Sequence, residues 1–194
     1  MSFAFLLVDD VQRAGALGQQ EAFEALYSLY HGPVRRYLYQ LCGSADHAEE
    51  LAQETFVKAY TGLLSFRGTC SAATWLFRIA RNTYRNSRRR PSPAQIDTDE
   101  LQAIPDTTSY GDPVERYAAG ERRSLIGLVL AQLPEQQRSI LLLRDAEGLA
   151  YIEIADVLGI SVAAVRMKLF RARNTFRQAY MELEGAEGEP DAEL

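Results

Sequence analysis

The chain has 194 residues, enough for one large domain or two small ones, and its 47% hydrophobic and 24% charged residues are typical of a protein that buries a core. Two cysteines and two histidines are too few for a disulfide framework or a zinc cluster, so we expect no metal and no cofactor. The net charge of −5 argues against nucleic-acid binding if it is spread evenly, and the longest uncharged apolar run, residues 3–8, is too short to span a bilayer, which favours a cytoplasmic protein.

Apolar residues recur at helical spacing through the first half of the chain, and no stretch alternates as a strand does. The predicted helices there cover residues 9–17, 21–30, 33–43, 44–64 and 72–89. Gly32-Pro33 separates the second helix from the third, because proline cannot continue the hydrogen-bond ladder but suits a first turn. Ser44 is the predicted N-cap of the fourth helix.

Pro91 and Pro93 end this first unit, and residues 92–113 have little apolar periodicity. The second unit is predicted to hold helices over residues 113–133, 134–146, 151–158 and 161–183, followed by an acidic, disordered tail over 184–194. The sequence therefore predicts an all-α protein with two small helical domains, residues 1–91 and 114–183, joined by a flexible acidic linker at residues 92–113.

Charge is distributed in blocks along these elements. Residues 67–90 carry seven arginines and no acid, residues 91–115 carry six acids and no base, and residues 166–177 carry five basic residues and no acid. Residues 182–194 hold six acids, and without them 21 basic residues face 20 acidic ones. Two basic blocks separated by an acidic one indicate that the chain does bind nucleic acid.

The stretch from Tyr151 to Arg166 has the spacing of a helix-turn-helix. Ala155 is small where the two helices cross, Gly159 allows the positive φ of the turn, and Ser161 caps the second helix. The second helix then presents basic side chains outward. A helix of this width fits the major groove of DNA.

The helix over residues 72–89 has one apolar face, and the rest of its surface is largely arginine and asparagine. Arginines would neutralise phosphates, and Asn82 and Asn86 could hydrogen-bond to base edges. Trp75 either belongs to the core, which the sequence slightly favours, or stacks on an unpaired base. The preceding helix places Phe56 and Tyr60 beside exposed acids, which indicates either a solvated face or a protein-docking surface.

Together these motifs resemble the extracytoplasmic-function (ECF) group of sigma subunits of bacterial RNA polymerase. Residues 46–60 are similar to the region 2 helix that docks on the polymerase clamp, and residues 74–82 are similar to the minus-ten recognition helix of that group. Residues 133–138, residues 141–149 and the helix-turn-helix are similar to region 4. The resemblance covers about residues 10–180 and implies region 2 in the first domain and region 4 in the second.

The resemblance implies three groups of site residues. The clamp group, which would bind core polymerase, is Glu50, Gln53, Glu54, Phe56 and Tyr60. The −10 group, which would bind the separated non-template strand, is Arg67, Thr69, Cys70, Trp75, Arg78, Arg81, Asn82, Arg85 and Asn86. The −35 group, which would lie in the major groove of the minus-thirty-five element, is Ser161, Arg166, Met167, Lys168, Phe170, Arg171 and Arg173.

The partners implied by the resemblance are core RNA polymerase, through its clamp and flap, and promoter DNA, both as a duplex and as a non-template single strand. An anti-sigma protein, often membrane-bound, would hold the chain inactive at the inner face of the membrane. The acidic linker would thread through the polymerase channel. No small-molecule substrate and no catalysis are expected, because no nucleophile–base pair, metal cluster or phosphate loop is visible.

The predicted function is promoter-specific transcription initiation as a dissociable polymerase subunit that recognises both promoter elements and promotes DNA opening. The free protein should bind promoter DNA poorly, because the negative linker opposes the two basic blocks. One alternative is a sigma mimic that sequesters an anti-sigma protein, which would not need the DNA-facing arginines. The other is a stand-alone helix-turn-helix regulator, which would leave the motifs of residues 46–90 without a role.

Overall fold

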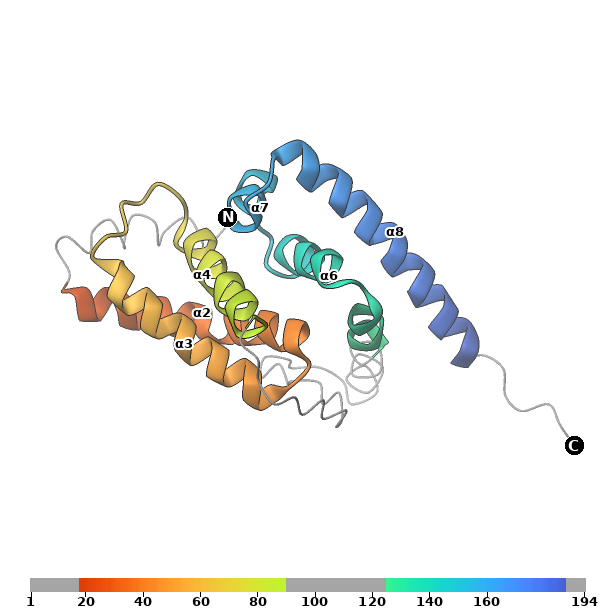
Figure 1. The fold of residues 1–194 in the computed structure, drawn as a ribbon, viewed down its shortest axis with the longest axis horizontal. Coiled ribbons are helices and arrows are strands. Elements are labelled where there is room, and N and C mark those ends of the chain that lie inside the picture. The colour runs from red at the N-terminus through yellow and green to blue at the C-terminus, as the bar shows by residue number, and fades with distance from the viewer. Residues whose placement is uncertain (1–17, 90–124, 188–194) are drawn as a thin grey trace, which may run out of the picture.

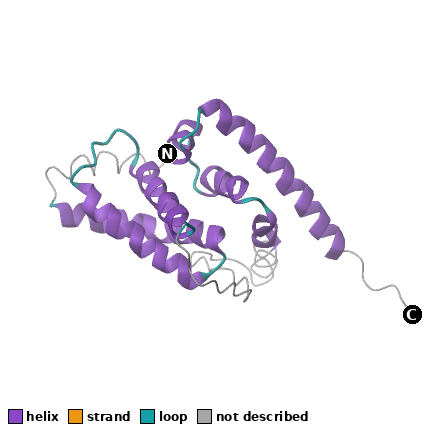
Figure 2. Ribbon diagram, in the orientation of Figure 1, coloured by secondary structure: helices purple, strands orange, loops and turns teal. Residues whose placement is uncertain are grey.

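The fold of the chain, a computed structural model, is described for residues 18–89 and 125–187, and all regular structure within these ranges is helical (Figures 1 and 2). The elements are α2 (Gln19–Cys42), α3 (Ala45–Leu63), α4 (Ala72–Ser87), a helical stretch at 125–132, α6 (Glu135–Leu141), a π-helical turn (Leu142–Ala146), α7 (Tyr151–Leu158) and α8 (Val162–Glu187). The all-α prediction is confirmed. The predicted helix at 9–17 and the predicted linker at 92–113 lie outside the described residues.

Helix α2 corrects one sequence prediction, because it is a single helix that runs through Pro33. Val34 and Tyr37 after the proline are buried on the same side as Ala22 and Leu26 before it. A proline inside a helix costs about 3 kcal/mol, whereas burying one large apolar side chain contributes about 1.5–3 kcal/mol. A continuous buried face therefore outweighs the backbone hydrogen bond lost at Pro33.

Side-chain caps place the beginnings of α3 and α4. The Ser44 hydroxyl accepts a hydrogen bond from the His47 amide at 3.3 Å, which confirms the predicted cap. Ser71 caps α4 in the same way, accepting from the Thr74 amide at 3.1 Å. Helices α2 and α3 lie side by side, and α4 packs on both of them (Figure 1). This arrangement forms the first helical unit, residues 18–89.

The second helical unit, residues 125–187, contains the predicted helix-turn-helix. Helix α7 has the predicted bounds, and Gly159 after it has φ +66° and ψ 40°. The Ser161 hydroxyl accepts a hydrogen bond from the Ala164 amide at 3.2 Å, as expected of a cap. Ala155 and Val165 are buried where α7 and α8 meet. Helix α8 continues to Glu187, so the first four residues of the predicted tail are helical.

The two helical units share one core, which the sequence did not predict. Their buried side chains form a continuous cluster, and α4 lies between α2 and α3 on one side and α6 and α7 on the other (Figure 1). The hydroxyl groups of Tyr37 from α2 and Ser139 from α6 are 2.7 Å apart, and both residues are buried. Burial raises the pKa of Tyr37 to about 12, so this hydrogen bond joins neutral groups over the whole ordinary pH range.

Replacing Gly159 by alanine should destabilise the protein by about 1–2 kcal/mol, because a Cβ is strained at a left-handed φ. The free energy of unfolding in urea measures the effect. Gly185 is the matched control: it lies inside α8 with open space around it, so alanine there should stabilise by about 0.5–1 kcal/mol or leave stability unchanged. Equal effects at the two positions would contradict the assigned turn.

Candidate polymerase and promoter interfaces

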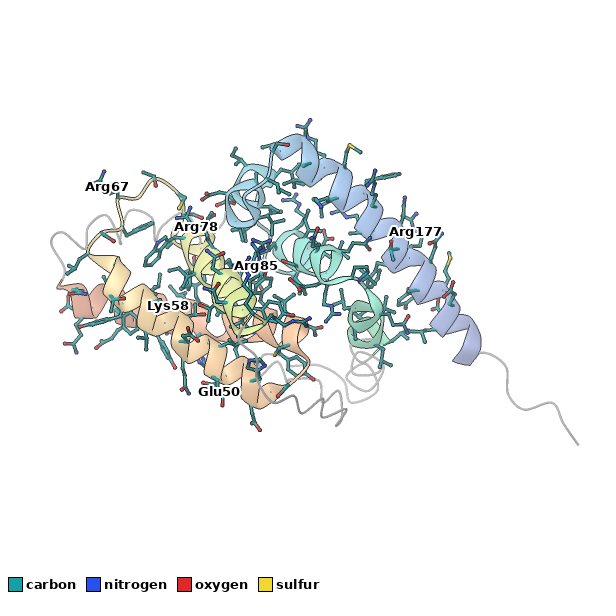
Figure 3. All side chains as sticks on the ribbon, viewed as in Figure 1. Glu50, Lys58, Arg67, Arg78, Arg85 and Arg177 are labelled. Carbon is teal, nitrogen blue, oxygen red and sulfur yellow. The ribbon has the colours of Figure 1, made fainter. Side chains whose placement is uncertain are left out.

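One side of α3 presents an acidic and polar surface. Glu50, Gln53 and Tyr60 of the clamp group are exposed, and Figure 3 labels Glu50 near the beginning of this helix. Glu54 is half-buried and its carboxylate lies 2.7 Å from the Lys58 ammonium group. The Lys58 ammonium also donates to the Thr83 hydroxyl on α4 at 3.0 Å. This lysine, which the sequence analysis did not single out, ties the acidic face of α3 to α4.

Phe56 was wrongly predicted to lie at the surface, because it is only 3% exposed. Its ring is the centre of an aromatic cluster between α2 and α3 that also contains Phe23, Tyr27, His31 and Tyr60. Aromatic packing between two helices buries a large apolar area, and that decides where Phe56 points. The periodicity of α3 places Phe56 one position after the buried Thr55, at the edge of the core face, where sequence alone is ambiguous.

The aromatic cluster is partly open to solvent. Tyr27 is 42% exposed and Tyr60 is 43% exposed, and Val57 on α3 and Leu64 directly after α3 are 64% and 79% exposed. Exposed aromatic and aliphatic side chains grouped on one surface are typical of protein-docking surfaces.

The −10 group divides by burial. The exposed members are Arg67, Thr69, Asn82, Arg85 and Asn86, and the half-buried members are Cys70, Arg78 and Arg81. Trp75 is only 9% exposed, with its ring 4.8 Å from that of Phe66 in the loop before α4. The indole is therefore a core residue beneath this loop. A Cβ at Gly62 would lie 3.2 Å from the indole, so α3 packs against it closely.

Part of the polar face of α4 is covered by the second helical unit. The Arg78 guanidinium donates to both carboxylate oxygens of Asp156, at 2.8 and 3.0 Å. Arg81 donates to the Leu158 carbonyl at 3.5 Å, and burial lowers its pKa. The end of a helix favours a nearby cation, so this position at the end of α7 partly offsets the desolvation of Arg81.

The Cys70 thiol lies in the same region and is not activated. Burial raises its pKa, and the nearby Arg78 guanidinium only partly counters that effect, while Asp156 and Glu153 add to it. A raised pKa leaves the thiol protonated near neutral pH, so it is a poor nucleophile. Both cysteines in the chain are free.

The outer face of α8 carries the −35 group. Its exposed members are Ser161, Arg166, Met167, Phe170, Arg171 and Arg173. Met167 is 59% exposed and Phe170 is 68% exposed, unusually high values for such side chains. Lys168 is half-buried and donates to Gln136, and Arg173 is paired with Asp145 at 2.6 Å. Arg166 and Arg171 are therefore the members most available to an anion.

Sequence reasoning missed the residues that join the two helical units. They include Glu153 and Asp156 on α7, Tyr37 on α2, and Ser139 and Arg138 on α6. The Arg138 guanidinium donates to the Gln40 carbonyl on α2 at 2.7 Å, and to carbonyls at the end of the helix at 125–132. Each of these residues is an ordinary residue of its own helix, so its local sequence does not reveal a contact with the other unit. Only Glu153, the third residue of α7, carries a local signal, because its carboxylate accepts a hydrogen bond from the Ala150 amide at 2.8 Å and so forms half of a capping box.

No group of three or more histidine, cysteine or acidic side chains is placed to hold a metal ion among residues 18–89 and 125–187. No helix in those ranges combines the length and the apolar content that a membrane span requires.

Comparison with known families agrees with the division into two helical units. Residues 26–92 match the family "Sigma-70 region 2", and residues 123–176 match the family "Sigma-70, region 4". The first match spans the acidic face of α3 and the basic helix α4. The second spans the helix-turn-helix.

Curated relatives are similar over most of their length. The RNA polymerase sigma-H factor of Pseudomonas aeruginosa is 34% identical over 184 residues, covering 91% of this chain and 93% of that protein. The RNA polymerase sigma factor YlaC of Bacillus subtilis is 36% identical and covers 79% and 89%. The ECF RNA polymerase sigma-E factor of Escherichia coli is 34% identical and covers 87% and 89%.

Solved structures with the same fold are those of CnrH in complex with the cytosolic domain of CnrY and of the sigma factor RpoE in complex with the anti-sigma factor NepR from Bartonella quintana. The first has a TM-score of 0.60 at 24% identity and covers 90% of this chain and 95% of that one. The second has a TM-score of 0.64 at 22% identity and covers 82% and 96%. With the family matches and the curated relatives, the chain belongs to the ECF group of sigma factors, the subunits with which bacterial RNA polymerase recognises promoters.

Proposed function

We propose that the three residue groups divide the work of this sigma factor: the clamp group binds core polymerase, the −10 group binds the non-template strand, and the −35 group reads duplex DNA. The observation that carries the proposal is that one chain holds an arginine- and asparagine-rich helix next to an acidic, aromatic docking face, and a separate helix-turn-helix with free arginines. A DNA-binding regulator that acts alone would need only the last of these.

On α3, polymerase docking is supported by the exposed Glu50, Gln53 and Tyr60. Phe56 acts from below, by holding the aromatic cluster that positions Tyr60. Acidic side chains at the rim of such a surface steer the approach of a basic partner and fix its orientation. Exposed Val57 and Leu64 add apolar area to the same surface.

On α4, single-strand binding is supported by donors that suit phosphates and base edges. Arg85, Asn82 and Asn86 are exposed along one side, and Arg67 lies in the loop before the helix (Figure 3). Trp75 supports that loop from the core, so its contribution to binding is to hold the loop in place. Readout of an unpaired base then falls to the loop residues, of which Thr69 is exposed.

On α8, major-groove binding is supported by Arg166, Met167, Phe170 and Arg171, which project from the beginning of the helix that follows the turn. Arginine donates to guanine edges or to phosphates, and the apolar side chains suit the methyl group of thymine. Arg173 is held by Asp145 and is better placed for a phosphate than for a base.

An anti-sigma protein is the expected inhibitor, because two structures of the same fold are complexes with the cytosolic domain of CnrY and with NepR. The sigma-mimic alternative is disfavoured by the exposed arginines of α4 and α8, which a mimic does not need. We further propose a non-enzymatic initiation factor that works in the cytoplasm, reaching the inner face of the membrane only through a membrane-bound inhibitor. Domain functions follow the predicted boundaries, with region 2 in residues 1–91, the linker at 92–113 and region 4 in 114–183.

Replacing Arg166 or Arg171 by alanine should lower promoter-specific transcription about tenfold, because one good base contact is worth about 1–3 kcal/mol. Run-off transcription with core polymerase, from promoters mapped with the wild-type chain, measures this. Arg177→Ala is the control on the same helix, further from the turn, and should stay within about twofold of the wild type. Loss of the same size in all three variants would contradict groove reading by this part of α8.

Replacing Glu50 by lysine should weaken binding to core polymerase at least about tenfold, because like charges that face each other at an interface are repulsive. Anisotropy of the labelled chain, titrated with core polymerase, measures the affinity. Glu24→Lys makes the same charge change at an exposed position on α2 and should leave affinity nearly unchanged. If Glu24→Lys weakens binding as much as Glu50→Lys, the docking surface is not the α3 face.

A further inference from the structure

Two carboxylates of α7 lie on the beginning of α4. Glu153 accepts hydrogen bonds from the Ser71 hydroxyl at 2.6 Å and from the Thr74 hydroxyl at 2.9 Å. One turn along, Asp156 takes both of its hydrogen bonds from Arg78, at 2.8 and 3.0 Å. Three donors of the first helical unit, two hydroxyls and one guanidinium, are thus satisfied by acids of the second.

These three donors are of the kind that bind the phosphates of nucleic acids. Arginine, serine and threonine side chains and the beginnings of helices make most phosphate contacts in protein–DNA complexes. Here Ser71 caps α4, Thr74 is in its first turn and Arg78 is one turn further on. The Glu153 and Asp156 carboxylates have the charge and the acceptor oxygens of two phosphates. Helix α7 therefore meets α4 with the chemistry of a DNA backbone.

The loop before α4 faces the same place. Thr69 and Cys70 line one wall of a cleft of about 710 Å³, and Ile152, Asp156 and Gly159 of the helix-turn-helix are on the other. A DNA strand that ran along the −10 group from the loop to Arg78 would need this cleft and the hydrogen-bond donors that α7 now uses. Helix α7 and a DNA strand therefore cannot bind this part of α4 at the same time.

A second set of contacts, between α6 and α2, fixes the position of α7 on α4. Tyr37 and Ser139 share a buried hydrogen bond, and Arg138 reaches the Gln40 carbonyl. These contacts place α6 on α2, and α6 and α7 belong to one compact unit. By contrast, Arg166 and Arg171 on α8 point to solvent in the same arrangement. The closed arrangement covers part of the −10 group and leaves Arg166 and Arg171 of the −35 group exposed.

We propose that α7 is an internal mimic of the minus-ten strand, so that in the free chain Glu153 and Asp156 occupy the strand-binding donors of α4 and must leave before the −10 group can bind DNA. The inference rests on the proposed function of the −10 group. The sequence analysis attributed weak DNA binding by the free chain to the negative charge of the linker. Helix α7 would be a second cause of weak binding, and it would act only at the −10 group. Core polymerase would have to draw the two helical units apart.

Disulfide trapping tests whether the closed arrangement exists in solution. Cys70 and Asp156 line the same cleft, so Asp156→Cys in a Cys42→Ser background places a second thiol across that cleft from Cys70. Copper phenanthroline with dissolved oxygen removes two electrons and two protons and joins them. Asp145→Cys in the same background is the control, because Asp145 faces Arg173 within the second helical unit. Cross-linking of the first variant alone is expected, and its absence would overturn the proposal.

Strand binding tests the mimicry. The probe is a fluorescein-labelled single-stranded DNA of random sequence, titrated with the free full-length chain. Glu153→Gln with Asp156→Asn should bind it about tenfold more tightly than the wild type, because a minor open state limits the apparent affinity. Glu24→Gln with Glu182→Gln removes the same charge at exposed positions elsewhere and should change affinity less than about twofold. Equal gains in both double variants would mean a general charge effect and overturn the proposal.

The disulfide cross-link locks the closed arrangement, whereas the double substitution weakens it. The cross-linked chain should bind the single strand more weakly than the same chain after reduction, and unchanged binding would overturn the mimicry. Run-off transcription with core polymerase separates the two hypotheses. If the wild-type chain gives no promoter-specific transcript although trapping and strand binding behave as expected, the proposed function fails while the α4–α7 competition stands. If transcription is normal but the double variant binds like the wild type, only the competition fails.

Discussion

The amphipathic character of α4 is the constraint on which both halves of the structure depend. Its apolar side, with Trp75, Leu76 and Phe77, must be buried to hold α2 and α3 together. That burial leaves its arginines and asparagines on the remaining surface, where they need anions or water. In this structure the second helical unit provides some of the anions. The same helix therefore builds the core of the first unit, contacts the second, and carries the groups proposed to bind DNA.

The contact between the two units combines strong and weak elements, which suits an arrangement that must open. The Tyr37–Ser139 hydrogen bond is buried, and leaving either hydroxyl unpaired would cost about 1–3 kcal/mol. The Arg78–Asp156 pair is more than one-third exposed on both sides, and such pairs contribute about 0–1 kcal/mol. Glu153 lies between these cases: burial acts to raise its pKa, but hydrogen bonds from Ser71, the Ala150 amide and Thr74 outweigh it and lower that pKa. Polar faces between domains generally separate more readily than apolar ones.

Much of the fold was predictable because its signals are local. Ser44, Gly159 and Ser161 mark helix ends through the backbone conformation or the hydrogen bond that each supplies, and the structure has them in those roles. Pro33 misled the prediction, because a proline signal is also local but the burial of α2 against its neighbours outweighs it. Phe56 misled it for a related reason: its position at the edge of a helical face is compatible with either environment until a second helix is placed beside it.

By itself, the amino-acid sequence determined the all-α fold class, the helix-turn-helix, the order of acidic and basic blocks and, through its motifs, the sigma-factor family. Each of these depends on residues close together in the chain, or on a pattern that is read in order. Only the tertiary structure decided that Phe56 is a core residue and that Glu153 and Asp156 face Ser71, Thr74 and Arg78 about eighty positions away. The sequence around a carboxylate on the polar face of a helix is the same whether that carboxylate faces water or another helix. The partner of the carboxylate is fixed by how two separately folded surfaces fit together, which no local spacing encodes.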